Sequence, residues 1–130
     1  MGFVTILDES PVGETYLARR IEITAESITL RELIRQRVQE EVEEFNRKQS
    51  DVFYGLIQPT ETERVLNGYR LKTRRPLSWE TQYEKAVNAF EANGFFVIVD
   101  GNQVEDLDEN IPLNETSEVH FLKLIPLIGG

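Results

Sequence analysis

A strand ends and a helix begins within the stretch Ile21-Glu-Ile-Thr-Ala-Glu-Ser-Ile-Thr-Leu-Arg-Glu-Leu33. Ile21 and Ile23 are separated by a glutamate, which is the alternation of a strand with one apolar face. Thr29 and Glu32 have the spacing of a capping box, in which the two side chains satisfy backbone N–H groups at the start of a helix. The stretch therefore predicts a strand that leads directly into a helix.

The residues on either side of this stretch extend both elements. Phe3 to Leu7 and Thr15 to Ile23 are predicted strands, and the Pro- and Gly-containing run between them predicts a turn, so that the two strands form a hairpin. The helix continues as an apolar stripe with spacings of three and four residues, formed by Leu30, Leu33, Ile34, Val38, Val42 and Phe45. Such a stripe needs a sheet to cover it.

The middle of the chain predicts a short hairpin and a second helix. Val52 to Ile57 has the composition of a strand, and Asn67-Gly68 is a type I′ hairpin signal. A short helix from Thr60 to Gly68 is the alternative, and we favour the hairpin. Ser78 is the predicted cap of a helix that ends at Asn93-Gly94, and its apolar stripe is interpreted as core: Trp79, Tyr83, Ala86, Val87 and Phe90.

Three further strands are predicted in the last third of the chain. Phe95 to Val99 is a continuous apolar run, which predicts a strand buried on both faces, and Asp100-Gly101 turns it towards Gln103-Val104. An acidic loop then leads to a final strand at Glu118 to Leu122. This order predicts an α+β fold with one sheet packed on a helix, in which the first and last strands lie side by side in the middle.

Two stretches and the final residues resemble the ubiquitin-like β-grasp family. Ile21 to Leu33 is similar to the second strand and helix start of that family. The run Val97-Ile-Val-Asp-Gly-Asn-Gln-Val-Glu-Asp-Leu-Asp-Glu-Asn-Ile-Pro-Leu113, with Glu118-Val-His-Phe121 and Gly129-Gly130, is similar to its C-terminal half. The same run is similar to the diglycine sulfur-carrier proteins of molybdopterin and thiamine biosynthesis. The resemblance implies one β-grasp domain over residues 1–123, a mixed sheet packed on a helix, with a hairpin and helix inserted at about 47–93 and a flexible tail at 124–130.

The resemblance implies a protein modifier of a bacterial-type conjugation pathway, not an enzyme. A partner activating enzyme would use ATP to adenylate the Gly130 carboxylate, and an isopeptide bond to an amine of a target protein would follow, with no cofactor in the chain itself. Gly129 and Gly130 have no Cβ and would pass through a narrow channel of that enzyme. A conjugating enzyme and a deconjugating protease are the other implied partners. Tail contacts with them are expected from Leu124, Ile125, Pro126, Leu127 and Ile128, and surface contacts from His120 and Leu122.

Other functions fit the same residues. In a sulfur carrier Gly130 would become a thiocarboxylate, and in a β-grasp binding module without conjugation the diglycine would be incidental. The apolar tail would then pack back on the body. Ile128 stands where ubiquitin has an arginine, which implies a dedicated activating enzyme.

Composition and charge argue against several classes of function and binding site. A net charge of −9 without a long basic stripe argues against nucleic acid. The acidic runs Glu40–Glu44 and Glu105–Glu109 are interpreted as solvated faces, and no metal site is expected at the second run. Without cysteine the chain offers no thiolate, and its one histidine, His120, cannot build a histidine metal site. No membrane span and no signal peptide are expected, so that a cytoplasmic location is predicted.

Overall fold

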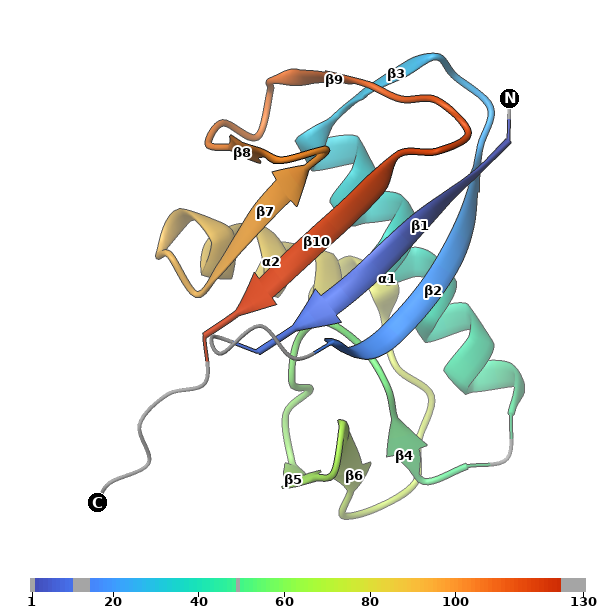
Figure 1. Cartoon of the computed structure of the whole chain (residues 1–130). Helices are drawn as coiled ribbons and strands as arrows, with labels where there is room; N and C mark the ends of the chain where they lie inside the picture. Colours follow the sequence, from blue (N-terminus) through green and yellow to red (C-terminus); the bar gives the residue numbers. More distant parts are fainter. Residues whose placement is uncertain (1, 11–14, 49, 125–130) are drawn as a thin grey trace. The chain divides into compact units, whose positions relative to one another are not determined.

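The computed structural model describes residues 2–10, 15–48 and 50–124, which form an α+β fold with a mixed sheet and two helices (Figure 1). This confirms the predicted α+β class and the mixed sheet, whereas the β-grasp fold stays a prediction. The largest sheet has the strand order β2-β1-β10-β7-β8. Its strands are β1 (Gly2–Glu9), β2 (Thr15–Ile23), β7 (Phe95–Val99), β8 (Asn102–Val104) and β10 (Glu118–Lys123).

The first and last strands of this sheet are parallel neighbours. β1 pairs with β10 in parallel, from Thr5 opposite Glu118 to Glu9 opposite Leu122, and every other neighbouring pair in the sheet is antiparallel. The N-terminal hairpin of β1 and β2 is confirmed, with Val4, Ile6, Ile21 and Ile23 buried on one face. The side-by-side arrangement of the first and last strands is confirmed as well (Figure 1).

The prediction that β7 is buried on both faces is wrong. Phe95, Val97 and Val99 are buried, whereas Phe96 and Ile98 are only half-buried. A continuous apolar run does not say whether both faces are covered. In β7 the face that carries Phe96 and Ile98 is partly exposed to solvent.

The first helix, α1 (Leu30–Arg47), begins where the capping-box spacing predicts. The acidic loop bonds its first turn, because the N–H groups of Leu30 and Arg31 donate to the carbonyl oxygens of Glu109 (3.2 Å) and Leu107 (2.8 Å). Beside this contact a two-stranded sheet joins β3 (Ser27–Thr29) to β9 (Asn110–Pro112). Neither strand was predicted, since three residues are too few to show a periodicity.

The chain divides into two compact units. The first comprises residues 1–31 and 89–130, and the second comprises Glu32–Asn88. The predicted stripe of α1 is buried at Leu30, Leu33, Ile34 and Val38, while its packing on the sheet stays a prediction. No helix in the described ranges is long and apolar enough to span a bilayer.

The second unit contains a three-stranded sheet in the order β4-β6-β5, formed by β4 (Val52–Phe53), β5 (Thr62–Val65) and β6 (Gly68–Leu71). The favoured hairpin is confirmed, but its turn is Leu66-Asn67 and not a type I′ turn at Asn67-Gly68. Val65 pairs with Gly68, and of the two turn residues Asn67 has a positive φ of 63°. Gly68 is needed for a different reason, because a Cβ there would lie 2.9 Å from the carbonyl oxygen of Phe53.

The second helix, α2 (Trp79–Glu91), has both predicted ends. The Ser78 hydroxyl accepts a hydrogen bond from the Thr81 N–H at 3.3 Å. At the other end the Gly94 N–H donates to Ala89 and the Asn93 N–H donates to Phe90, which is the Schellman pattern with Asn93 (φ 61°) as the left-handed residue. Of the predicted stripe Ala86 is fully buried, and the buried Gln82, which was not predicted, donates to the carbonyl oxygen of Ile57 at 2.8 Å.

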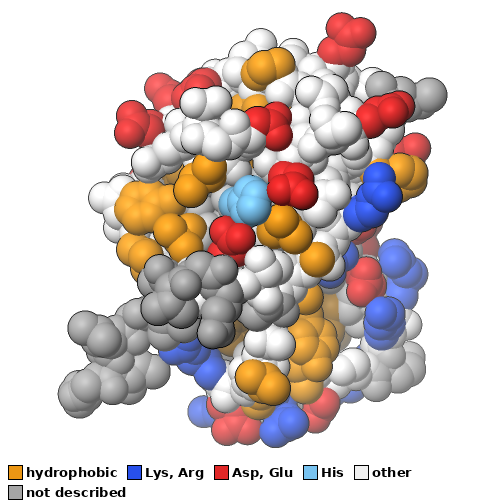
Figure 2. All heavy atoms as spheres, in the orientation of Figure 1, with side chains coloured by type: hydrophobic (Ala, Val, Ile, Leu, Met, Phe, Trp, Pro, Cys, Tyr) orange, Lys and Arg blue, Asp and Glu red, His pale blue; other side chains and the backbone are white. Residues whose placement is uncertain are grey.

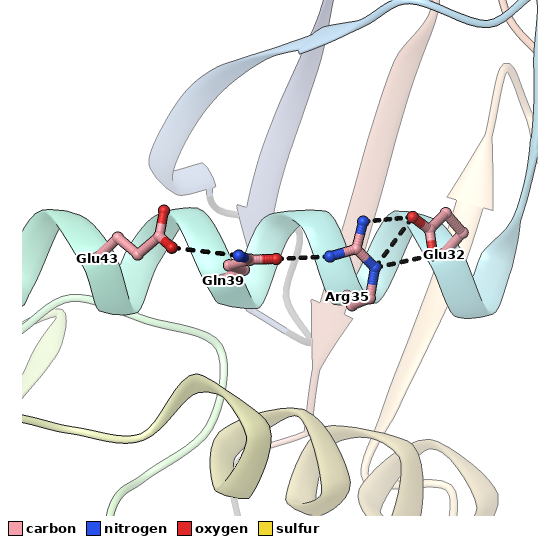
Figure 3. Close-up of polar contacts among 4 residues, drawn as sticks. All are labelled: Glu32, Arg35, Gln39 and Glu43. Atoms are coloured by element: carbon pink, nitrogen blue, oxygen red, sulfur yellow. Dashed lines mark hydrogen bonds and ion pairs between the residues drawn. The ribbon is translucent and has the colours of Figure 1, made fainter.

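Side chains on α1 form a polar ladder in the second unit (Figure 3). The Arg35 guanidinium hydrogen-bonds both carboxylate oxygens of Glu32 and donates to Gln39 at 2.5 Å, and Gln39 donates to Glu43 at 3.1 Å. Arg35 also lies 5.9 Å from the ring centroid of Trp79, a cation–π contact between α1 and α2. The hydrogen bonds from Arg35 hold the pKa of Glu32 below its ordinary value.

The prediction that Glu41 lies on a solvated acidic face is wrong. Glu41 is 2% exposed and accepts a hydrogen bond from Arg37 at 2.8 Å, with both side chains buried. Its second carboxylate oxygen accepts the Leu56 N–H at 3.1 Å. The carboxylate therefore joins α1 to the segment that follows β4.

Candidate functional site

Strand β10 divides its side chains between two faces of the sheet. Val119 and Phe121 are 0% exposed, and His120 and Leu122 point to the opposite face, where both are half-buried. We call that opposite face the outer face. The predicted orientation of His120 and Leu122 is confirmed, and their role in binding stays a prediction.

The register places apolar neighbours beside both residues on the outer face. Leu7 of β1 and Ile98 of β7 are opposite His120, while Phe96 of β7 is opposite Leu122. Figure 2 shows the histidine in the middle of this view, with hydrophobic side chains to one side and acidic side chains close by. Half-buried apolar side chains around a polar centre are suited to docking a protein, because contact would remove more apolar area from water.

The His120 ring is held between two carboxylates. Its Nδ1 lies 3.0 Å from Glu9 Oε2, and its Nε2 lies 3.3 Å from Glu118 Oε1. Thr15 Oγ1 donates to the same Glu9 oxygen at 3.2 Å. Both ring nitrogens can donate together only when the imidazole is protonated. The two contacts fix the orientation of the ring.

Neither carboxylate was predicted as part of this site. Glu118 gives a local signal, since it lies two residues before His120 and a strand places such residues on one face. Glu9 gives none, because its approach depends on the parallel register that sets Glu9 opposite Leu122.

The predicted tail begins at a fixed point. The Leu124 N–H donates to the Gly94 carbonyl oxygen at 3.2 Å, and the Leu124 side chain is 40% exposed. The other predicted tail and activation residues lie outside the described residues: Ile125, Pro126, Leu127, Ile128, Gly129 and Gly130. Leu124, the one described residue of the predicted tail, therefore follows directly on the end of β10.

Compared with protein-family models, curated proteins and solved structures, the chain matches none of them.

The acidic loop is explained by the helix start beside it. Arg31 binds the Asp108 carboxylate through Nε at 3.0 Å and Nη2 at 3.4 Å, which holds the pKa of Asp108 below its ordinary value. Carboxylates are also favoured at the N-terminus of a helix by its macrodipole. Within the described part of the chain, no group of three or more His, Asp or Glu side chains is arranged to hold a metal ion.

Proposed function

We propose that the chain is a ubiquitin-like protein modifier with a β-grasp fold. The observation that carries the proposal is the parallel pairing of β1 with β10 in the middle of the sheet, after a hairpin and a helix. This is the arrangement that the resemblance of Ile21–Leu33 and Val97–Leu113 implies. The inserted segment at about 47–93, with its own three-stranded sheet, is an addition to that plan.

The position of Leu124 supports separate roles for the body, which would bind the activating enzyme, and for the tail, which would carry Gly130 to the active site. The backbone of the chain is held by the sheet as far as the Leu124 N–H. Six residues follow, and an extended chain of that length spans at most about 20 Å. An activating enzyme can thus bind the outer face at His120 and Leu122 and still receive Gly130 in an active site that lies apart from this face.

The proposed chemistry begins at the carboxylate of Gly130. One of its oxygens attacks the α-phosphorus of ATP, which forms a mixed anhydride with AMP and releases pyrophosphate. A partner cysteine thiolate attacks the acyl carbon and expels AMP, so that a thioester forms. A target lysine amine then displaces the thiolate and loses a proton, which leaves an isopeptide bond. The proposal requires a free carboxylate on Gly130, either as made or after processing.

The product has a specific mass signature that tests the proposal. Trypsin cleaves after Lys123, so a conjugated lysine would keep the remnant Leu-Ile-Pro-Leu-Ile-Gly-Gly. We expect this remnant on lysines of other proteins when the tagged chain is expressed in its source cells and purified under denaturing conditions. Gly129→Val should abolish it, because a branched side chain would block entry into a channel that must exclude water from the adenylate.

Two outcomes would contradict the modifier proposal. Sulfur in place of one Gly130 carboxylate oxygen, without lysine remnants, would assign the chain as a sulfur carrier. Unmodified chain alone, together with no cellular effect of deleting Gly130, would leave a binding module. Leu66→Ala is the matched control, because Leu66 is 86% exposed on the β5–β6 turn and should change neither product.

A further inference from the structure

A groove with a volume of about 590 Å³ lies along the outermost strand of the five-stranded sheet. All the residues that line it belong to the first unit. Apolar side chains line it at Phe90, Phe96 and Leu107, and strand β8 contributes Gln103 and Val104. The groove thus combines apolar surface with the edge of a strand.

The backbone of Gln103 faces that free edge. The turn between β7 and β8 is Asp100-Gly101, with φ values of 48° and 86°, and Val99 pairs with Asn102. These angles indicate a type I′ turn, whose flanking residues form a hydrogen-bonded pair. Hydrogen-bonded and non-bonded pairs alternate along an antiparallel ladder, so the next pair, Ile98 and Gln103, is non-bonded. The N–H and C=O of Gln103 therefore point away from β7, where another strand can pair with them.

The groove continues the outer face around the edge of the sheet. Gln103 lies opposite Ile98, which lies opposite His120, so the three side chains form one row. Phe96 lines the groove and also lies opposite Leu122. A partner bound to the outer face can thus extend a segment into the groove without leaving the surface.

The groove is negatively charged and therefore favours a positively charged occupant. Four carboxylates line it against one guanidinium, and that guanidinium, Arg31, binds Asp108. Among the described residues, no ion pair engages the remaining carboxylates, those of Glu91, Glu105 and Asp106. Basic side chains on the occupant would complement these carboxylates and reject an acidic segment.

We propose that this groove binds an extended segment of a partner protein in which aliphatic and basic side chains alternate. The segment adds to the sheet by pairing with Gln103, its aliphatic side chains contact Phe96 on the outer face, and its basic side chains contact Glu91 and Glu105. Backbone pairing provides affinity and the side chains provide specificity in this mode of recognition. The inference goes beyond the proposed conjugation and does not depend on the chemistry of Gly130.

The test uses the full chain and the synthetic peptide Lys-Val-Lys-Leu-Lys-Val-Lys, followed by two-dimensional NMR of the backbone amides. We expect saturable shifts concentrated at Phe96 and from Asn102 to Leu107, with slowed amide exchange at Gln103. Glu91→Lys combined with Glu105→Lys should weaken binding by about tenfold. Glu84→Lys combined with Glu80→Lys is the matched control, since both glutamates are exposed on α2 outside the groove, and it should leave the affinity unchanged.

Backbone pairing is tested separately from charge. Gln103→Pro removes the outward N–H from an edge strand, where proline is tolerated, and should abolish most of the binding. A peptide that is N-methylated at alternate residues tests the same bonds on the unaltered chain and should not bind. Equal binding of the N-methylated peptide, of the acidic peptide Glu-Val-Glu-Leu-Glu-Val-Glu, or of the two double charge variants would overturn the proposal.

Discussion

The carboxylate of Glu41 is the clearest case in which one buried group connects two segments of the second unit. It accepts hydrogen bonds from the Arg37 side chain on its own helix and from the Leu56 N–H. A buried ion pair is costly to desolvate, so its net contribution to stability is small, whereas a single partner left alone in the core is strongly unfavourable. Arg37 and Glu41 therefore depend on each other.

We predict that Glu41→Leu lowers the free energy of unfolding by roughly 3–5 kcal/mol, because it leaves a buried guanidinium without its carboxylate. The double variant Arg37→Met, Glu41→Leu should recover a large part of that loss, since both charges are then removed. It should not recover all of it, because the Leu56 N–H loses its acceptor. Equilibrium unfolding in urea measures both values. A double variant that is as unstable as the single one would contradict the interpretation of the pair.

At the scale of elements, the first turn of α1 is held by backbone hydrogen bonds to a loop and by a side-chain ion pair on the helix itself. Loop carbonyl oxygens of Leu107 and Glu109 bind its N–H groups, and Glu32 binds Arg35 one turn further on. The lowered pKa of Glu32 gives this turn a dependence on pH. The stability from the pair is complete above the pKa of Glu32 in the unfolded chain, and it is lost as the pH falls through the lower pKa of the folded protein.

We predict that Glu32→Gln lowers the free energy of unfolding by about 0.2–0.5 kcal/mol near neutral pH, which is the range for partly exposed pairs on a helix. The two proteins should be equally stable at a pH so low that Glu32 is protonated in both the folded and the unfolded chain. Unfolding of both proteins from neutral to acidic pH measures the difference. A carbon NMR titration of Glu32 provides the control: Arg35→Leu should raise its pKa towards the ordinary value, and Arg64→Leu, which alters an exposed arginine on β5, should not. A stability difference that persists in acid would contradict the assignment.

Local chemistry explains which elements could be predicted. The capping box at Thr29, the Ser78 cap and the Asn93-Gly94 end are signals carried by a few neighbouring residues, and all three place a helix end correctly. β3 and β9 have no such signal, because each exists only through pairing with a strand about 80 residues away. The contact of His120 with Glu9 was missed for the same reason, while the orientation of His120 followed from alternation along its own strand.

At the scale of the molecule, α1 crosses the boundary between the two compact units. Leu30 and Arg31 belong to the first unit and are bonded to its loop, whereas the helix from Glu32 onward belongs to the second unit. A helix of this length is marginal in water without tertiary packing. The boundary between the units therefore falls inside α1, and each unit includes only part of this helix.

We predict that the two units unfold in a single cooperative transition, because loss of either one removes the contacts that hold one part of α1. Native-state hydrogen exchange measures this directly. Amides of Leu33 to Phe45 should open with the same free energy as those of Val97, Val99 and Val119 to Phe121, and that shared value should equal the free energy of global unfolding. Limited proteolysis gives a second test. A chain that is cut between Ser50 and Leu77 should lose the large sheet as well. A cut chain that keeps this sheet would show that the two units unfold in separate transitions. Independent opening of Glu32–Asn88, with the strands of the large sheet still protected, would contradict the prediction and make the inserted segment, together with most of α1, a domain of its own.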